Sequence, residues 1–372
     1  MEQGKTRVAI LFGGRSAEHD VSRASAANVL RALDPCRYEI TLVGITREGR
    51  WIIADAGNGA GTGSAALVVP QDGPCLTLLP GGQGRALVVE TNAADAREIA
   101  AFDVVFPVLH GPNGEDGTVQ GALQLANVAY VGSGVIGSAA SMDKDVAKRL
   151  MRDAGLPIVP FVAMSASSPM SYEDATTIVG CPDLFVKPAN MGSSVGVSRA
   201  RNADQFAAAC KLALRFDKKI LIEQRIASLR EIECSVLEDA NGSVRASNLG
   251  EIVPNCKHGF YSYDAKYLDA DGAVLRVPAD MPAALAERTK ELAVRAFTVL
   301  CCESMARVDF FLSEEQVFVN EANTIPGFTN ISMYPKLWEA SGLSQPELMN
   351  ILIAHAHARH HRSMSLFAER DT

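Results

Sequence analysis

The sequence contains no apolar run of the roughly 18 residues that a membrane-spanning helix needs, although 48% of its 372 residues are hydrophobic. Its N-terminus, M-E-Q-G-K-T-R-V-A-I-L-F-G-G, holds one short apolar run that ends at two glycines. Such a run indicates a first buried strand rather than a secretory signal. We therefore expect a cytoplasmic protein that does not bind membranes.

Paired cysteine motifs and an excess of positive charge are also absent. The eight cysteines include no C-x-x-C pair, and Cys301 and Cys302 are adjacent, which prevents an ordinary bridge between them. This usage favours reduced thiols in a reducing compartment. The net charge of −8 argues against non-specific binding of nucleic acid, which requires a basic surface. The negative net charge does not exclude small anionic ligands, because local sites bind them.

Two common nucleotide-binding fingerprints are missing. Gly13 and Gly14 follow an apolar strand but do not complete G-x-G-x-x-G, so we reject binding of NAD. The phosphate-binding loop G-x-x-x-x-G-K-[ST] does not occur either. A dehydrogenase is therefore disfavoured.

The order of apolar segments predicts an α/β fold. Residues 7–12 and 38–45 are apolar runs, and the segment between them has helical spacing. A strand, a helix and a second buried strand are typical of a parallel sheet. A helix over 142–157 ends at Gly-Leu-Pro, which predicts a domain boundary nearby. The length of the chain predicts two or three domains.

Two apolar segments near the C-terminus, 305–312 and 316–321, each carry an acidic residue. If they form a hairpin, Asp309 and Glu321 can lie on one face, and Arg307 shares that face because strand side chains alternate. With the amide of Asn323, these oxygens suit Mg²⁺, and an arginine beside them suits phosphoryl transfer. The alternative is a polar hairpin face without a metal.

The stretch K-P-A-N-M-G-S-S-V-G-V-S begins at Lys187, at the end of an apolar strand. Its loop can fold backbone N–H groups and the hydroxyls of Ser193 and Ser194 over phosphate oxygens. We expect Lys187 and Lys144 to reach phosphates, because an unpaired ammonium within D-L-F-V-K-P would be unfavourable. An ordinary hairpin turn and a solvated lysine are the alternatives.

Further candidates lie at strand ends and in loops. Glu18 follows the first strand, where doubly wound sheets bind ligands, and His110 ends another strand at the same kind of edge. The polar, aromatic stretch F-Y-S-Y-D-A-K-Y over 260–267 indicates either a mobile loop or a surface hairpin. The stretch H-A-H-A-R-H-H over 355–361 predicts a solvated helix tail rather than a metal site.

Together these stretches resemble the D-alanine–D-alanine ligases of the ATP-grasp superfamily. The matching segments run in order from residue 10 to about 340: L-F-G-G-R-S-A-E-H-D-V-S, H-G-P-N-G-E-D-G, M-D-K, V-K-P-A-N-M-G-S-S-V-G, F-Y-S-Y-D-A-K-Y, M-A-R-V-D-F-F and N-E-A-N-T-I-P-G-F-T-N-I-S-M-Y-P-K-L. The resemblance implies an N-terminal Rossmann-like domain (1–141), a central ATP-grasp subdomain (142–224) and a C-terminal one (225–372), with ATP gripped between the last two.

The resemblance also implies an activity: ATP-dependent joining of two D-alanines through an acyl phosphate, for peptidoglycan precursors, in a homodimer with two Mg²⁺ or Mn²⁺. The residues that it assigns to ATP are Lys144, Lys187, Ser193, Ser194, Glu223, Gln224, Ile226, Glu231, Phe260, Lys266, Asn320 and Glu321. Those that it assigns to the metals are Asp309, Glu321 and Asn323. Those that it assigns to substrate and catalysis are Glu18, His110, Ser193, Lys266, Tyr267, Arg307, Gly327, Ser332 and Met333.

Other activities stay open at the level of sequence. Relatives that make D-alanyl-D-lactate lack the loop pair Lys266-Tyr267, which is present here, so we favour the dipeptide. Another ATP-grasp carboxylate–amine ligase differs only in its acceptor. A catalytically inactive nucleotide-binding regulator would lack Arg307, a metal ligand or the loop tyrosine, and this chain retains them all. The segment I-A-S-L-R-E-I-E departs from relatives that have glycine before the arginine, which leaves the loop shape near Glu231 in doubt.

Overall fold

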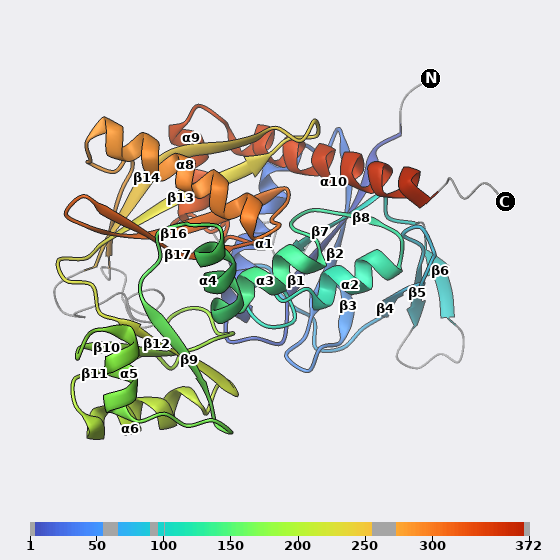
Figure 1. Cartoon of the computed structure of the whole chain (residues 1–372). Helices are drawn as coiled ribbons and strands as arrows, with labels where there is room; N and C mark the ends of the chain where they lie inside the picture. Colours follow the sequence, from blue (N-terminus) through green and yellow to red (C-terminus); the bar gives the residue numbers. More distant parts are fainter. Residues whose placement is uncertain (1–3, 55–65, 90–95, 100, 255–272, 368–372) are drawn as a thin grey trace.

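The computed structural model describes residues 4–54, 66–89, 96–99, 101–254 and 273–367. Within these residues the strands form three sheets of eight, four and five strands. In Figure 1 the first sheet lies with the blue and cyan part of the chain, the second forms the green lobe, and the third carries the yellow and orange strands. No helix in the described ranges combines the length and the apolar character that crossing a bilayer requires.

The first sheet has the strand order β6-β5-β4-β3-β2-β1-β7-β8. Its parallel part, β2-β1-β7-β8, confirms the parallel sheet expected from the sequence, and β3 to β6 extend it with antiparallel pairs. The strands are β1 (Thr6–Gly13), β2 (Tyr38–Ile45), β3 (Trp51–Ala54), β4 (Cys75–Leu78), β5 (Ala86–Val89), β6 (Ala96–Ile99), β7 (Val104–Val108) and β8 (Ala129–Tyr130). The helices between these strands and after β8 are α1 (His19–Ala32), α2 (Thr118–Leu125) and α3 (Val135–Met142).

The second sheet, β11-β10-β12-β9, is antiparallel throughout. It comprises β9 (Phe161–Ser165), β10 (Leu184–Pro188), β11 (Ser198–Ala200) and β12 (Lys219–Gln224), with α5 (Tyr172–Val179) and α6 (Ala203–Ala213). Local signals set the ends of α5. The side chain of Ser171 accepts a hydrogen bond from the N–H of Asp174, which satisfies an end donor. Gly180 then ends the helix at a φ of 77°, which glycine adopts readily.

The third sheet has the order β15-β14-β13-β16-β17. It comprises β13 (Arg230–Glu238), β14 (Val244–Pro254), β15 (Ala273–Arg276), β16 (Met305–Ser313) and β17 (Gln316–Asn323), with α8 (Ala283–Val299) and α9 (Met333–Ala340). Alternation along β16 decides which side chains face the core. Val308 and Phe310 are buried in a cluster with α8, so Arg307 and Asp309 point to the other face.

Two helices join the sheets. Helix α4 (Lys144–Asp153) follows α3, and the side chain of Asp143 caps its N-terminus. Helix α10 (Gln345–Phe367) runs back along the first sheet, as Figure 1 shows in red. Its apolar residues, including Leu352 and Ala356, share one core cluster with β1 and β7. The domain boundaries expected from the sequence, 1–141, 142–224 and 225–372, stay a prediction. Helix α10 belongs to the third of these segments, although it packs on the first sheet.

The expectation of a solvated helix tail over 355–361 is wrong for two residues. His355 is fully buried, and its Nε2 lies 3.2 Å from a carboxylate oxygen of Glu238. Arg359 stacks on the ring of Tyr130 at 4.2 Å and forms an ion pair of 3.2 Å with Glu303. These contacts attach α10 to both the first and the third sheet, which a periodicity argument does not detect.

Candidate active site

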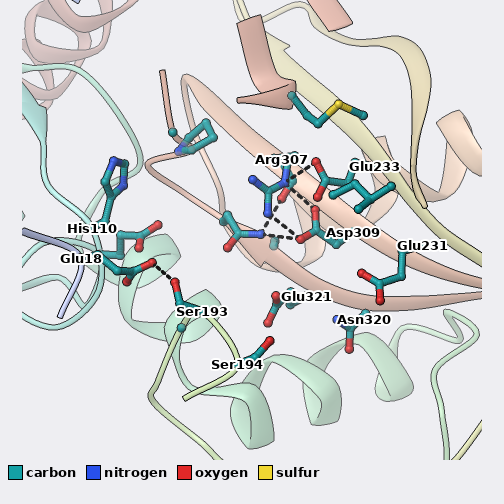
Figure 2. Close-up of a pocket in the computed structure, with 18 of the residues that line it drawn as sticks. Glu18, His110, Ser193, Ser194, Glu231, Glu233, Arg307, Asp309, Asn320 and Glu321 are labelled. Atoms are coloured by element: carbon teal, nitrogen blue, oxygen red, sulfur yellow. Dashed lines mark hydrogen bonds and ion pairs between the residues drawn. The ribbon is translucent and has the colours of Figure 1, made fainter. Parts of the chain in front are cut away.

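A cavity of about 770 Å³ opens between the three sheets. Every predicted site residue that the structure describes lines it: Glu18, His110, Lys144, Lys187, Ser193, Ser194, Glu223, Gln224, Ile226, Glu231, Arg307, Asp309, Asn320, Glu321, Asn323, Gly327, Ser332 and Met333. The predicted residues Phe260, Lys266 and Tyr267 lie outside the described residues. Residues from distant parts of the chain thus meet in one cavity (Figure 2).

The hairpin of β16 and β17 confirms the predicted arrangement of its polar side chains. Asp309 is the register partner of Glu321, and Arg307 is that of Asn323. The guanidinium of Arg307 donates two hydrogen bonds of 2.7 Å to the two oxygens of Asp309. Its Nε also lies 3.0 Å from Oε2 of Glu233 on β13, and Figure 2 shows Arg307 facing both acids.

The charge on Arg307 is held firmly by these partners. Burial lowers the pKa of the guanidinium, but Asp309 and Glu233 outweigh it and raise the pKa well above its usual range. The strand pair therefore presents a permanent cation beside carboxylate oxygens. Such a group can stabilise negative charge that develops on a substrate in a site sheltered from water.

The oxygen ligands on this hairpin fit a hard divalent cation. Asp309 and Glu321 are neighbours across the strands, and the amide nitrogen of Asn323 donates to Asp309 at 3.0 Å, so the side chain of Asn323 lies beside these carboxylates. No cluster of three or more His, Cys, Asp or Glu side chains with metal-binding geometry occurs in the described part of the chain. Mg²⁺ needs no such cluster, because it commonly takes one or two carboxylates, waters and substrate phosphates.

Lys144 connects helix α4 to this hairpin. Its Nζ lies 3.2 Å from Oε2 of Glu321 and donates a hydrogen bond of 2.9 Å to the carbonyl of Met191. Burial lowers the pKa of Lys144, but the charge and hydrogen bond of Glu321, with the charges of Glu223 and Glu115, together outweigh burial and raise the pKa, so the group stays cationic. The glycine- and serine-rich loop and the hairpin thus share one lysine.

Lys187 and Lys148 both bind the carboxylate of Glu223 on β12. The distances are 2.7 Å from Lys187 to Oε2 and 3.0 Å from Lys148 to Oε1. Lys187 also lies 3.4 Å from Oδ1 of Asn320. Burial raises the pKa of Glu223, but the two lysines outweigh it and lower the pKa below its usual range. Because Lys148 also pairs with the carboxylate of Glu223, this buried carboxylate keeps a cationic partner when Lys187 moves away from it.

Substituting Lys148 by methionine should destabilise the protein by about 2 kcal/mol, because a buried carboxylate then keeps only one cationic partner. Lys187 should also be held more tightly by Glu223 and be less available to an anionic ligand. Urea unfolding measures the first effect and the KM for a phosphate-bearing substrate the second. Lys211→Met, at an exposed position of α6, is the matched control. Equal stability and KM in both variants would contradict this role of Lys148.

Glu18 and Ser193 join the first and second sheets across the cavity. The hydroxyl of Ser193 donates a hydrogen bond of 2.5 Å to Oε1 of Glu18 (Figure 2). Ser193 and Ser194 have φ angles of 54° and 59°, a conformation uncommon for residues other than glycine and frequent at functional sites. Glu18 also approaches the backbone closely, since a Cβ at Gly111 would lie 2.8 Å from its Oε2.

His110 is buried, and its ring contacts the protein through both nitrogens. Nδ1 lies 3.0 Å from the carbonyl of Ile325, and Nε2 lies 3.4 Å from the hydroxyl of Ser25. Burial lowers the pKa of His110, so the neutral ring is favoured. The predicted residue Ser332 likewise contacts its own loop, because its hydroxyl accepts a hydrogen bond of 2.9 Å from the N–H of Thr329.

Three charged residues of the site were missed at the level of sequence. Glu115 lies within H-G-P-N-G-E-D-G, and burial, with a further contribution from Glu18, raises its pKa to about 8. Lys148 lies one helical turn after Lys144, a spacing that places both on one side of α4. Glu233 lies two residues after Glu231, so it shares the same strand face. The spacing rules alone could have found Lys148 and Glu233.

Comparison with known proteins yields consistent matches over the whole chain. Residues 7–133 match the family model described as D-ala D-ala ligase N-terminus, and residues 150–354 match that described as D-ala D-ala ligase C-terminus. A D-alanine--D-alanine ligase of Bradyrhizobium sp. (strain BTAi1 / ATCC BAA-1182) is 68% identical, with 100% of both chains covered. That of Bradyrhizobium sp. (strain ORS 278) is 66% identical, again over 100% of both.

Solved structures have the same fold. The D-alanine-D-alanine ligase from Coxiella burnetii matches with a TM-score of 0.82 at 35% identity, covering 98% of this chain and 97% of the other. VanG D-Ala:D-Ser ligase from Enterococcus faecalis matches with a TM-score of 0.79 at 31% identity, covering 95% and 100%. The motifs, the three-sheet fold and these matches agree, and the chain belongs to the D-alanine–D-alanine ligase family.

Proposed function

We propose that this chain uses ATP to join two D-alanine molecules into D-alanyl-D-alanine, a building block for peptidoglycan precursors. Membership of the family supports the activity. The observation that carries the chemistry is the face of the β16–β17 hairpin, where Arg307, Asp309 and Glu321 meet Lys144 in one cavity. This face combines cations with oxygen ligands, as transfer of a phosphoryl group to a carboxylate requires.

ATP binds between the second and third sheets in this proposal. Lys144 and Lys187 contact its phosphates, together with the loop hydroxyls of Ser193 and Ser194. The end of β12 and the start of β13 hold the nucleoside: Glu223, Gln224 and Ile226 at adenine, and Glu231 at ribose. Asp309, Glu321 and Asn323, with Asn320 beside them, would hold two Mg²⁺ or Mn²⁺ ions, which neutralise phosphate charge when bound.

The first step activates a carboxylate, which is by itself a poor electrophile. One carboxylate oxygen of the first D-alanine attacks the γ-phosphorus of ATP, and the bond from that phosphorus to the β–γ bridging oxygen breaks. An acyl phosphate and ADP result. Glu18 holds the ammonium group of this D-alanine, and Lys144 and Lys187 reduce the repulsion between the two anionic reactants.

The second step forms the peptide bond. The second D-alanine, received near Ser332 and Met333, loses a proton from its ammonium group, since only the neutral amine is a nucleophile. The amine attacks the acyl carbon, a tetrahedral intermediate forms, and its collapse expels inorganic phosphate. Arg307 and the backbone N–H of Gly327 stabilise the negative charge on the intermediate. Lys266 and Tyr267 complete the site, with Tyr267 joining Glu18 and Ser193, and help to exclude water.

The acceptor is the part of the proposal that the fold does not decide. The Enterococcus faecalis protein with the same fold is VanG D-Ala:D-Ser ligase. Acceptor choice depends on a few contacts within a common architecture. D-serine and D-lactate are therefore the informative competitors, beside any other amine acceptor of an ATP-grasp ligase.

We expect phosphate release from ATP and Mg²⁺ to depend on D-alanine and to be matched by D-alanyl-D-alanine. The assay compares D-alanine, L-alanine, D-alanine with D-serine, and D-alanine with D-lactate, and mass spectrometry identifies each product. L-alanine is the stereochemical control and should give no release above background. A folded, ATP-binding protein without D-alanine-dependent release would overturn the ligase assignment, and a preference for D-serine or D-lactate would change the acceptor.

Three further proposals follow from family membership. The chain works as a homodimer in the cytoplasm, and it folds as three domains over 1–141, 142–224 and 225–372. The arrangement of three sheets supports the division into domains. Light scattering coupled to size-exclusion chromatography measures the mass in solution, and the sequence mass of 39.6 kDa is the monomer reference.

A further inference from the structure

The loop after β17 is held in an unusual way on both sides of Gly327. Ile325, two residues before this glycine, donates its N–H to Oε1 of Glu115 at 3.2 Å, and its carbonyl lies 3.0 Å from Nδ1 of His110. Phe328, one residue after it, donates its N–H to the hydroxyl of Ser25 at 3.0 Å.

The second polar group of Phe328 is bound in the same manner. Its carbonyl accepts a hydrogen bond of 2.6 Å from the side-chain amide of Asn28. Both backbone groups of Ile325 and both of Phe328 therefore have side-chain partners from the first sheet's part of the chain. Backbone groups in loops more often bond to neighbouring backbone or to water. Four side-chain partners on the two sides of one glycine therefore indicate that the position of this loop matters for function. We call Ser25, Asn28, His110 and Glu115 the loop clamp.

Two members of the clamp are also linked to each other. A neutral His110 that donates from Nδ1 to Ile325 has an acceptor at Nε2, which lies 3.4 Å from the hydroxyl of Ser25. Ser25 can then donate to His110 while it accepts from Phe328, so every polar group in this ring is satisfied. Glu115 is fixed as well, because its Oε2 accepts a hydrogen bond of 2.8 Å from the N–H of Gly111.

Packing makes the clamp stiff. Ser25 is fully buried, and Phe328 is 3% exposed. The ring of Phe328 packs edge-on against Phe106 at 6.5 Å and against Tyr334 at 5.6 Å. The loop is therefore held by apolar contacts with Phe106 and Tyr334, and by hydrogen bonds to the part of the chain that carries Glu18.

We propose that the loop clamp positions the N–H of Gly327 relative to Glu18, so that the donor for the oxyanion and the site for the first substrate's ammonium group belong to one rigid frame. Ser25, Asn28, His110 and Glu115 act as positioning residues. This inference rests on the proposed function, because it gives Gly327 its role in the second step. Preorganised donors stabilise developing charge only when they are held in place, and an error of about 1 Å can lower a rate by about 100-fold.

The first test substitutes Ser25 by alanine, which removes an acceptor without adding volume. We expect kcat to fall about 10-fold because the loop keeps its other three partners. The KM for ATP should stay within about 2-fold, since no clamp residue is placed at the nucleotide. Loss of folded protein would also lower the apparent kcat at an unchanged KM, so each rate is divided by the concentration of protein that binds ATP. Asn28→Ala, at a partly exposed position, should show the same separation and carries less risk of misfolding.

The matched control is Tyr38→Phe. Tyr38 donates a hydrogen bond of 2.7 Å to Asn350 of α10, so its loss weakens a contact between the first sheet and the C-terminal segment without touching the loop. Its kcat should equal that of the wild type. Unchanged kcat in both clamp variants, or an equal fall in Tyr38→Phe, would overturn the proposal. An inactive wild-type protein would instead refute the ligase assignment, and this inference with it.

Discussion

Exchanging Glu321 for glutamine should lower kcat by at least about 100-fold, the scale seen when a group that stabilises transition-state charge is removed. Glu321 is the register partner of Asp309 and lies 3.2 Å from Lys144. The amide keeps the shape of the side chain but removes its charge, so the proposed metal site becomes weaker and Lys144 loses its carboxylate. The rate should therefore require more Mg²⁺ to saturate. Steady-state rates across a Mg²⁺ titration measure both changes.

Glu315→Gln is the control for this experiment. Glu315 lies at the exposed turn of the same hairpin, so the variant makes the same chemical change outside the cavity. Its kcat and its Mg²⁺ dependence should match those of the wild type. A wild-type rate for Glu321→Gln at low Mg²⁺ would show that this carboxylate holds no catalytic metal.

Replacing Arg307 by lysine should lower kcat by about 100-fold or more, although the positive charge is kept. The guanidinium donates to both oxygens of Asp309 and reaches Glu233 at the same time. A lysine ammonium is a single point of charge and cannot reproduce this planar fork. It would leave one acid partner weakly bound and the cation displaced from the reacting atoms. The KM for ATP should change much less than kcat, because the proposed role belongs to the intermediate.

A matched arginine exists in the same sheet. Arg230 forms a comparable fork, with distances of 2.7 and 2.9 Å to the two oxygens of Glu251, and it is absent from the cavity lining. Arg230→Lys should therefore keep kcat within about 2-fold, since this partly buried pair lies outside the cavity. If both variants lose the same activity, the effect of Arg307→Lys reflects the fold and not the chemistry.

Much of the site was predictable because its residues are close together in sequence or follow a simple period. Arg307, Asp309 and Glu321 share a face because side chains alternate along a strand and a short turn joins β16 to β17. Val308 and Phe310 on the same strand are apolar and buried. Their burial excludes the alternative arrangement, in which Arg307 and Asp309 would face the core. The glycine and serine loop after Lys187 was visible for a similar reason, since its special backbone angles limit the residues that fit.

The sequence by itself determined the order of strands and helices, the polar face of the hairpin and, through its motifs, the family. Only the tertiary structure decided the contacts between distant segments. Ser25 binds Phe328 across 303 residues, and Glu115 binds Ile325 across 210. The burial of His355 beside Glu238 belongs to the same class. Local periodicity reports which face of an element is apolar, but it does not report which other element covers that face. The partners of these polar groups were therefore set by the packing of the sheets and α10, which brings segments far apart in the chain into hydrogen-bond distance.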